Sequence, residues 1–141
     1  MKKSTLLFNY NFNIVGLRYN DFLKWDKNLS GYGYRYSDMR ATAGENLYNF
    51  SKDLSLTTNG RYVLYVDSGY RNEAHQRSLE YLPTATKAGY SEHQLGLAAD
   101  LMLYDNLSGK IIPLTTVRTC ILWSFLPPLR KSIMRSMLAI L

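Results

Sequence analysis

Residues 96–103, Gly-Leu-Ala-Ala-Asp-Leu-Met-Leu, form an apolar run that contains a single charged side chain, that of Asp100. An apolar run of this length predicts a buried strand. A carboxylate inside such a strand is costly unless it is paired or bound to a metal. His93 lies seven residues earlier, and imidazole and carboxylate are both good zinc ligands. We therefore expect His93 to approach Asp100 from the preceding loop, to within roughly 3–4 Å, so that the two share one metal ion.

The pattern upstream of this run predicts an α+β fold. An apolar stripe at helical spacing favours a helix over residues 38–56, with Ser37 as its cap and Asn59-Gly60 as its end. Residues 61–66 are rich in β-branched and aromatic side chains and predict a strand. We expect this strand and residues 96–103 to lie together in a small, mainly antiparallel sheet, with the helix packed on one face. The stripe consists of Met39, Ala43, Leu47, Phe50 and Leu54.

Three shorter features complete the expected organisation. Asn72 is placed to cap a short helix that runs to about Tyr81, and residues 83–89 form a loop. Residues 110–112 follow a turn and are the expected hairpin partner of the 96–103 strand. The tyrosine-rich segment 31–36 allows two interpretations, a platform for stacking sugars or bases and, favoured here, tyrosines packed at the domain edge.

Length and charge limit the function classes. At 141 residues the chain suits one domain with a real core, and we expect a monomer. The formal net charge is +6, but residues 106–141 hold five basic residues and no acid, which argues against a nucleic-acid surface on the domain. No run reaches the ~18 apolar residues of a membrane span, and the single cysteine, Cys120, excludes an internal disulfide. Asn9, Asn11 and Asn13 interrupt the apolar N-terminus, so the chain as written is expected to be cytoplasmic.

Two motifs occur in a fixed order along the chain. Ser68-Gly69-Tyr70-Arg71 is followed by Gln76, and residues 91–100 have the pattern Ser-x-His-x-x-Gly-x-Ala-x-Asp. In order and spacing they resemble the zinc-dependent D-alanyl-D-alanine carboxypeptidases of the VanY type, the M15 peptidases. The similarity covers roughly residues 38–113. Two motifs in the right order are more specific than either alone, because short motifs recur by chance.

The resemblance implies a site and a substrate. His93 and Asp100 would be zinc ligands, Arg71 would stabilise the charge that develops on the scissile carbonyl oxygen, and Gln76 and Ser91 would hold the terminal groups of the substrate. The substrate class is a peptidoglycan stem peptide that ends in D-Ala-D-Ala. The chain would then divide into a poorly patterned segment 1–36, a peptidase-like core 37–114 with a zinc-peptidase-like fold, and a divergent basic tail 115–141.

The tail departs from the family pattern. The family continues with Glu-x-Trp-His, which supplies the general base and the third zinc ligand, whereas this chain has no glutamate or histidine after residue 93. A frameshifted or truncated gene end is favoured over a true divergent tail. As written, residues 130–141 are expected to form a short basic helix. We expect slow or no hydrolysis as written. The alternative function is a non-catalytic cell-wall-peptide-binding remnant of the same fold that retains Arg71, Gln76 and Ser91.

Several residues also have a purely structural interpretation. Arg71 could form a loop salt bridge, Gln76 could face solvent on its helix, and His93 could be a hydrogen-bonded structural histidine. His75 could be considered as a third ligand, but a surface position is the favoured interpretation. Glu92 lies beside His93. The family carries an acid at this position without catalytic use, so we assign it no role.

Overall fold

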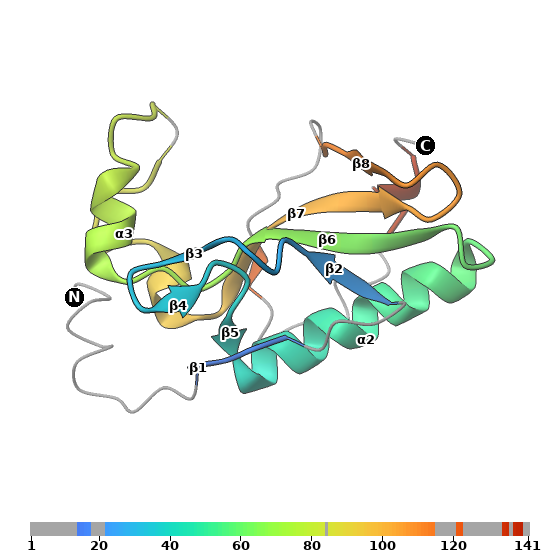
Figure 1. Cartoon of the computed structure of the whole chain (residues 1–141), viewed down its shortest axis with the longest axis horizontal. Coiled ribbons are helices and arrows are strands. Elements are labelled where there is room, and N and C mark those ends of the chain that lie inside the picture. Colours follow the sequence, from blue (N-terminus) through green and yellow to red (C-terminus); the bar gives the residue numbers. More distant parts are fainter. Residues whose placement is uncertain are drawn as a thin grey trace.

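The computed structural model describes residues 14–17, 22–83, 85–114, 121–122, 134–135 and 137–139. Within these residues the chain has an α+β fold, as the sequence predicts. Figure 1 shows a central sheet with the long helix α2 (Ala41–Thr57) along one face and the short helix α3 (Glu73–Ser78) beyond one end. Residues 1–13 and most of the expected helix at 130–141 lie outside the described residues.

The central sheet is mainly antiparallel. Its strands run in the order β2 (Leu23–Trp25), β6 (Tyr62–Ser68), β7 (Ala98–Asp105) and β8 (Lys110–Ile112), and β9 (Ile121–Leu122) also pairs with β7. The β2–β6 pair is parallel, and all the pairs made by β7 are antiparallel. The predicted neighbourhood of β6 and β7 and the predicted hairpin of β7 and β8 are therefore confirmed.

Two small antiparallel pairs lie beside the sheet. β1 (Ile14–Val15) pairs with β5 (Met39–Arg40), and β3 (Ser30–Gly31) pairs with β4 (Tyr34–Arg35). In Figure 1 they lie near the end of the sheet from which β6 leads toward α3. Because α3 carries His75 and Gln76, these pairs border the region where the site residues gather.

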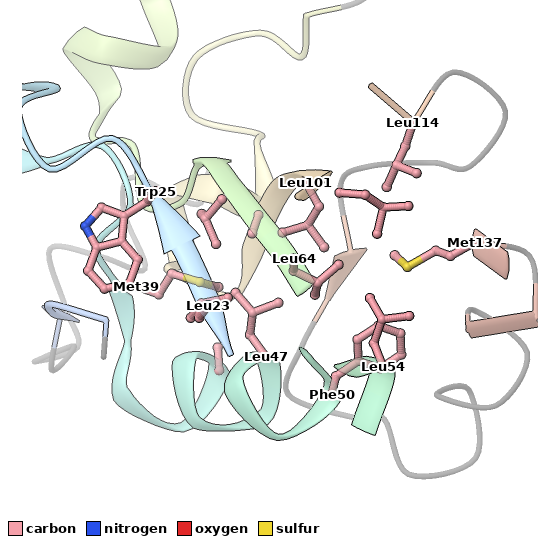
Figure 2. Packing of buried hydrophobic residues seen from close by; sticks show 14 of the residues in the cluster. Leu23, Trp25, Met39, Leu47, Phe50, Leu54, Leu64, Leu101, Leu114 and Met137 are labelled. Atoms are coloured by element: carbon pink, nitrogen blue, oxygen red, sulfur yellow. The ribbon is translucent and has the colours of Figure 1, made fainter. Parts of the chain in front are cut away.

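The core lies between α2 and the sheet. Side chains alternate along a strand, so Leu64 and Val66 of β6 and their partners Leu103 and Leu101 of β7 face the helix. The apolar stripe predicted for the helix meets them, and Figure 2 shows Leu47, Phe50 and Leu54 beneath Leu64 and Leu101. The whole stripe is fully buried, and it comprises Met39, Ala43, Leu47, Phe50 and Leu54.

The predicted start and cap of the long helix are wrong. The helix begins at Ala41 with Arg40 as its N-cap residue, and no side chain caps it. Residues before it are held extended by long-range backbone hydrogen bonds: Gly69 donates to the carbonyl of Tyr36, and Tyr70 donates to that of Asp38. Ser37, the predicted cap, is buried instead. Backbone groups satisfied by a distant segment outweigh a local capping signal. The predicted end near Asn59-Gly60 is confirmed within two residues.

Other boundaries move by two or three residues. The predicted strand 96–103 begins at Ala98, because Gly96 adopts a left-handed conformation (φ 70°) that ends the 3₁₀ helix η1 (Glu92–Leu95). Asn72 caps α3 as predicted, with its side chain accepting a hydrogen bond from the backbone N–H of His75, but the helix ends at Ser78. No helix in the described part of the chain is long and apolar enough to cross a membrane.

Candidate functional site

A pocket of about 1170 Å³ opens on the sheet near the end of β6. Alternation along β7 sends Leu101 and Leu103 into the core, so Asp100 and Met102 lie on the opposite face, where the pocket is. The helix α3, the loop after it and η1 form the other walls. All five residues that the sequence singled out line this pocket: Arg71, Gln76, Ser91, His93 and Asp100.

His93 is held rigidly. Its side chain is 2% exposed and belongs to η1, whose first turn is capped by Ser91: the hydroxyl of that serine accepts a hydrogen bond from the backbone N–H of His93 at 3.3 Å. The carbonyl of His93 accepts from the backbone N–H of Arg71 at 3.1 Å. The ring atom Nδ1 lies 2.6 Å from the carbonyl oxygen of Gly69. A carbonyl only accepts hydrogen bonds, so Nδ1 carries the proton and Nε2 keeps its lone pair.

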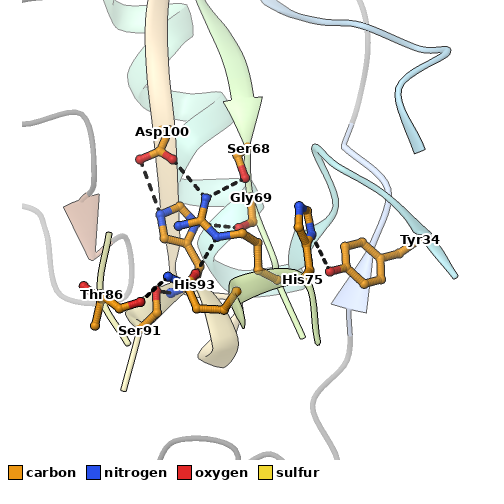
Figure 3. Close-up of polar contacts among 10 residues, drawn as sticks. Tyr34, Ser68, Gly69, His75, Thr86, Ser91, His93 and Asp100 are labelled. Atoms are coloured by element: carbon orange, nitrogen blue, oxygen red, sulfur yellow. Dashed lines mark hydrogen bonds and ion pairs between the residues drawn. The ribbon is translucent and has the colours of Figure 1, made fainter. Parts of the chain in front are cut away.

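Asp100 faces that lone pair. Its Oδ1 atom lies 3.4 Å from Nε2 of His93, and its Oδ2 atom lies 3.1 Å from Nη1 of Arg71 (Figure 3). Burial raises the pKa of this carboxyl, but the neighbouring His93 and the guanidinium of Arg71, which donates a hydrogen bond to it, outweigh burial, so the pKa lies below its ordinary value. Asp100 is therefore ionised at neutral pH. Its side chain is 31% exposed, so solvent and small ligands reach it from the pocket.

The His93–Asp100 distance falls within the range predicted from the sequence. With Nδ1 of His93 protonated, two acceptor atoms face each other across 3.4 Å, and a cation between them, a proton or a metal ion, makes this arrangement favourable. The bond from Nδ1 to a backbone carbonyl is the outer contact that orients metal-binding histidines. The chemistry of the donors fits zinc. In the described part of the chain no group of three His, Cys, Asp or Glu side chains gathers around one point, so the residues present supply two ligands.

Arg71 is anchored by three side chains. Its Nε atom donates to Oε1 of Gln76 at 2.8 Å, and its Nη1 atom donates to the hydroxyl of Ser68 at 2.9 Å as well as to Asp100. Gln76 is 1% exposed, and its Nε2 atom donates to the carbonyl of Thr86 at 2.6 Å. The interpretation of Gln76 as a solvent-facing residue is therefore wrong. Its amide links Arg71 to the loop that forms one wall of the pocket.

His75 is buried, so the expected surface position is wrong. It is 5% exposed, its Nδ1 atom is hydrogen-bonded to the hydroxyl of Tyr34 at 2.7 Å, and the ring of Tyr32 stacks on it at 4.6 Å. Burial, with the nearby charge of Arg71, lowers the pKa of His75 to about 4, and burial raises the pKa of Tyr34 to about 12. The tyrosines of segment 31–36 thus pack at the domain edge around a neutral histidine, with Tyr36 as the third ring.

Two residues at the end of β6 received no role from the sequence. Ser68 bonds Arg71, and its place at the start of the Ser-Gly-Tyr-Arg motif was an available signal. Asp67, the residue before it, lines the pocket. Burial and the neighbouring charge of Asp100 raise the pKa of Asp67, and Arg71 opposes them in part. A single acid at the end of a strand gives no sequence signal of its own.

No family model and no curated protein matches the chain. Among solved structures it is similar to the LdcB LD-carboxypeptidase, whose structure is described as revealing the molecular basis of peptidoglycan recognition. The TM-score is 0.41 and the sequence identity is 22%. The match covers 57% of this chain and 41% of that protein, so the chain corresponds to about two fifths of its length.

Proposed function

We propose that this chain is a zinc-dependent D-alanyl-D-alanine carboxypeptidase-type domain that acts on peptidoglycan stem peptides. The observation that supports it best is the pair of acceptors, Nε2 of His93 and Oδ1 of Asp100, which face each other across 3.4 Å at a pocket wall. The second support is Arg71, a buried guanidinium that lies beside the pair and lines the same pocket. The sequence resemblance supplies the substrate class.

Each residue has a defined task in this proposal. Bound zinc would supply a Lewis acid that polarises the scissile carbonyl and acidifies a water molecule. His93, oriented by the carbonyl of Gly69, and ionised Asp100 would hold it. Arg71 uses Nε and Nη1 for internal bonds, and no hydrogen bond of its Nη2 atom is found within the described residues. That atom is proposed to donate to an oxygen of the bound peptide.

The charge of the pocket makes peptide binding depend on the metal. Among the described residues that line it, three are carboxylates, Asp67, Glu92 and Asp100, and one is a guanidinium, that of Arg71. With neutral His93 the lining is net negative. A peptide that ends in a carboxylate is repelled by such a surface, and a divalent cation compensates for the excess negative charge of the pocket lining. We expect the stem peptide to bind more tightly when zinc is present.

A second candidate function follows from the ligand count. Two protein ligands hold zinc more weakly than the three of ordinary catalytic sites, and no third one joins them in the described part of the chain. The chain would then be a cell-wall-peptide-binding domain with no turnover, in which Arg71, Gln76 and Ser91 form the binding pocket. Equilibrium binding without product release would identify this function.

The test is release of D-alanine from a stem pentapeptide by the purified full chain supplied with zinc. We expect slow turnover, below the ~1 s⁻¹ at the lower end of ordinary enzymes, because the ligand set is small. His93→Ala should abolish it. Arg77→Ala is the matched control, since Arg77 is an exposed partner of Glu73 on α3. A chain that neither releases D-alanine nor binds the pentapeptide more tightly with zinc contradicts the proposal.

A further inference from the structure

The strand β6 ends in a β-bulge next to the pocket. Val66 is the partner of Leu101 in β7 and Ser68 is the partner of Asp100, so Asp67 between them has no partner of its own in β7. A bulge of this kind re-aims side chains and is common beside active sites. Here it allows Ser68 to bond Arg71 while Asp67 lines the pocket.

Asp67 differs from the other two carboxylates of the pocket. Asp100 is engaged by His93 and Arg71, and Glu92 has an interaction partner of its own. For Asp67, no hydrogen bond or ion pair is found within residues 14–17, 22–83 and 85–114, and its side chain is exposed to the pocket. It lies close enough to Asp100 for the two charges to interact. An available carboxylate therefore stands near the group that would hold the metal.

Peptide hydrolysis needs a group that takes a proton from water and returns it to the leaving amine. Neither oxygen of Asp100 is available, since one faces His93 and the other bonds Arg71. His93 donates its Nδ1 proton to the carbonyl of Gly69, and its Nε2 atom faces Asp100. Of the pocket side chains described, Asp67 is the carboxylate left for this role.

We propose that Asp67 is the proton acceptor for hydrolysis in this pocket, an inference that rests on the proposed function. As the oxygen of water bonds to the scissile carbonyl carbon, one proton of that water moves to the carboxylate of Asp67. When the carbon–nitrogen bond breaks, its electron pair stays on nitrogen, which takes the proton back from Asp67. The products are a shortened peptide with a new carboxylate and a free amino acid, and Asp67 is ionised again.

The test compares Asp67→Asn with Asp53→Asn. Both substitutions remove one negative charge and preserve side-chain size, but Asp53 is exposed on α2, across the sheet from the pocket. With Asp67→Asn we expect D-alanine release to fall ~10²–10⁴-fold, and the rising limb of the pH–rate profile to disappear. Asp67→Glu should retain part of the rate. Asp53→Asn should stay within about 3-fold of the unmodified chain, since a solvent-exposed charge outside the pocket is largely screened. Zinc affinity, measured by calorimetry, should change by less than about 3-fold in each variant.

Each outcome decides the role of Asp67. If Asp67→Asn turns over as fast as the unmodified chain, Asp67 is not the proton acceptor and the proposed function stands. If Asp67→Asn loses zinc together with activity, Asp67 is a ligand and the inference is wrong. If the unmodified chain binds zinc and the pentapeptide but releases no D-alanine, no proton acceptor operates and the binding function remains. A chain that binds neither overturns the proposed function and this inference together.

Discussion

Replacing Gln76 by alanine tests how the site is held in place. The side chain is buried and its amide makes two bonds: Oε1 accepts from Nε of Arg71 at 2.8 Å, and Nε2 donates to the carbonyl of Thr86 at 2.6 Å. Gln76→Ala removes both bonds, leaves a guanidinium N–H of Arg71 unpaired inside the protein and releases the carbonyl of Thr86, an exposed loop residue. Arg71 would then lose one of the contacts that fix it beside Asp100.

The expected cost follows from these two bonds. A hydrogen bond to a charged group contributes about 1.5–3 kcal/mol and a neutral one about 0.5–1.5 kcal/mol. Their sum predicts that Gln76→Ala lowers the free energy of unfolding by about 3 kcal/mol. Gln76 also holds Arg71, which lines the pocket. We therefore expect zinc-dependent binding of the pentapeptide to weaken as well.

Equilibrium unfolding in urea measures the first effect. Arg77→Ala is the control, because Arg77 neighbours Gln76 on the same helix and its exposed side chain forms an ion pair with Glu73 at 3.0 Å. Such a pair contributes about 0.3–0.5 kcal/mol. If Gln76→Ala destabilises the protein no more than Arg77→Ala does, the amide does not hold Arg71 in the way described.

Two further predictions concern the surroundings of the site. His75 takes up a proton near pH 6.5 when unfolded but only near pH 4 when folded, so its contribution to stability is present above pH 6.5 and is lost as pH falls toward 4. Urea unfolding from pH 7 to pH 4 should show a loss of about 1–2 kcal/mol after solvent screening that His75→Gln lacks; equal curves would refute this. Gly69→Ala should destabilise by about 2–3 kcal/mol, because its Cβ would lie 2.5 Å from the carbonyl oxygen of Asp38. Gly16→Ala, with its nearest contact at 3.8 Å, should stay within about 1 kcal/mol, and similar losses for the two variants would contradict the packing argument.

Local patterns predicted the elements that carry the site. The apolar run around Asp100 and the turn after it are sufficient to place β7 and its hairpin partner, since strand alternation and turn residues act over short distances. The stripe of α2 is equally clear, because burial of one helix face dominates its sequence. The approach of His93 to Asp100 also follows from spacing, as both lie within eight residues of one another along the chain.

Contacts between distant segments could not be predicted in this way. His75 is buried because Tyr34 and Tyr32 come from a segment about forty residues earlier, and nothing local to the helix indicates this. The helix start was misplaced for the same reason, since residues 36–40 bond to segments near Gly69 and Gly96. The bulge at the end of β6 places Asp67 at the pocket, and this bulge depends on how β6 pairs with β7. Each of these features becomes visible only when the sheet is assembled.

The central claim is that His93 and Asp100 hold a zinc ion. The chain contains two histidines, one in the proposed site and one buried among tyrosines, which gives a matched pair of variants. Calorimetric titration of the full chain with zinc alone should give one site per chain. We predict that His93→Ala weakens this site by more than about 100-fold and that His75→Gln leaves it within about 3-fold. Unchanged zinc affinity in His93→Ala, or loss of zinc in a folded His75→Gln variant, would contradict the account.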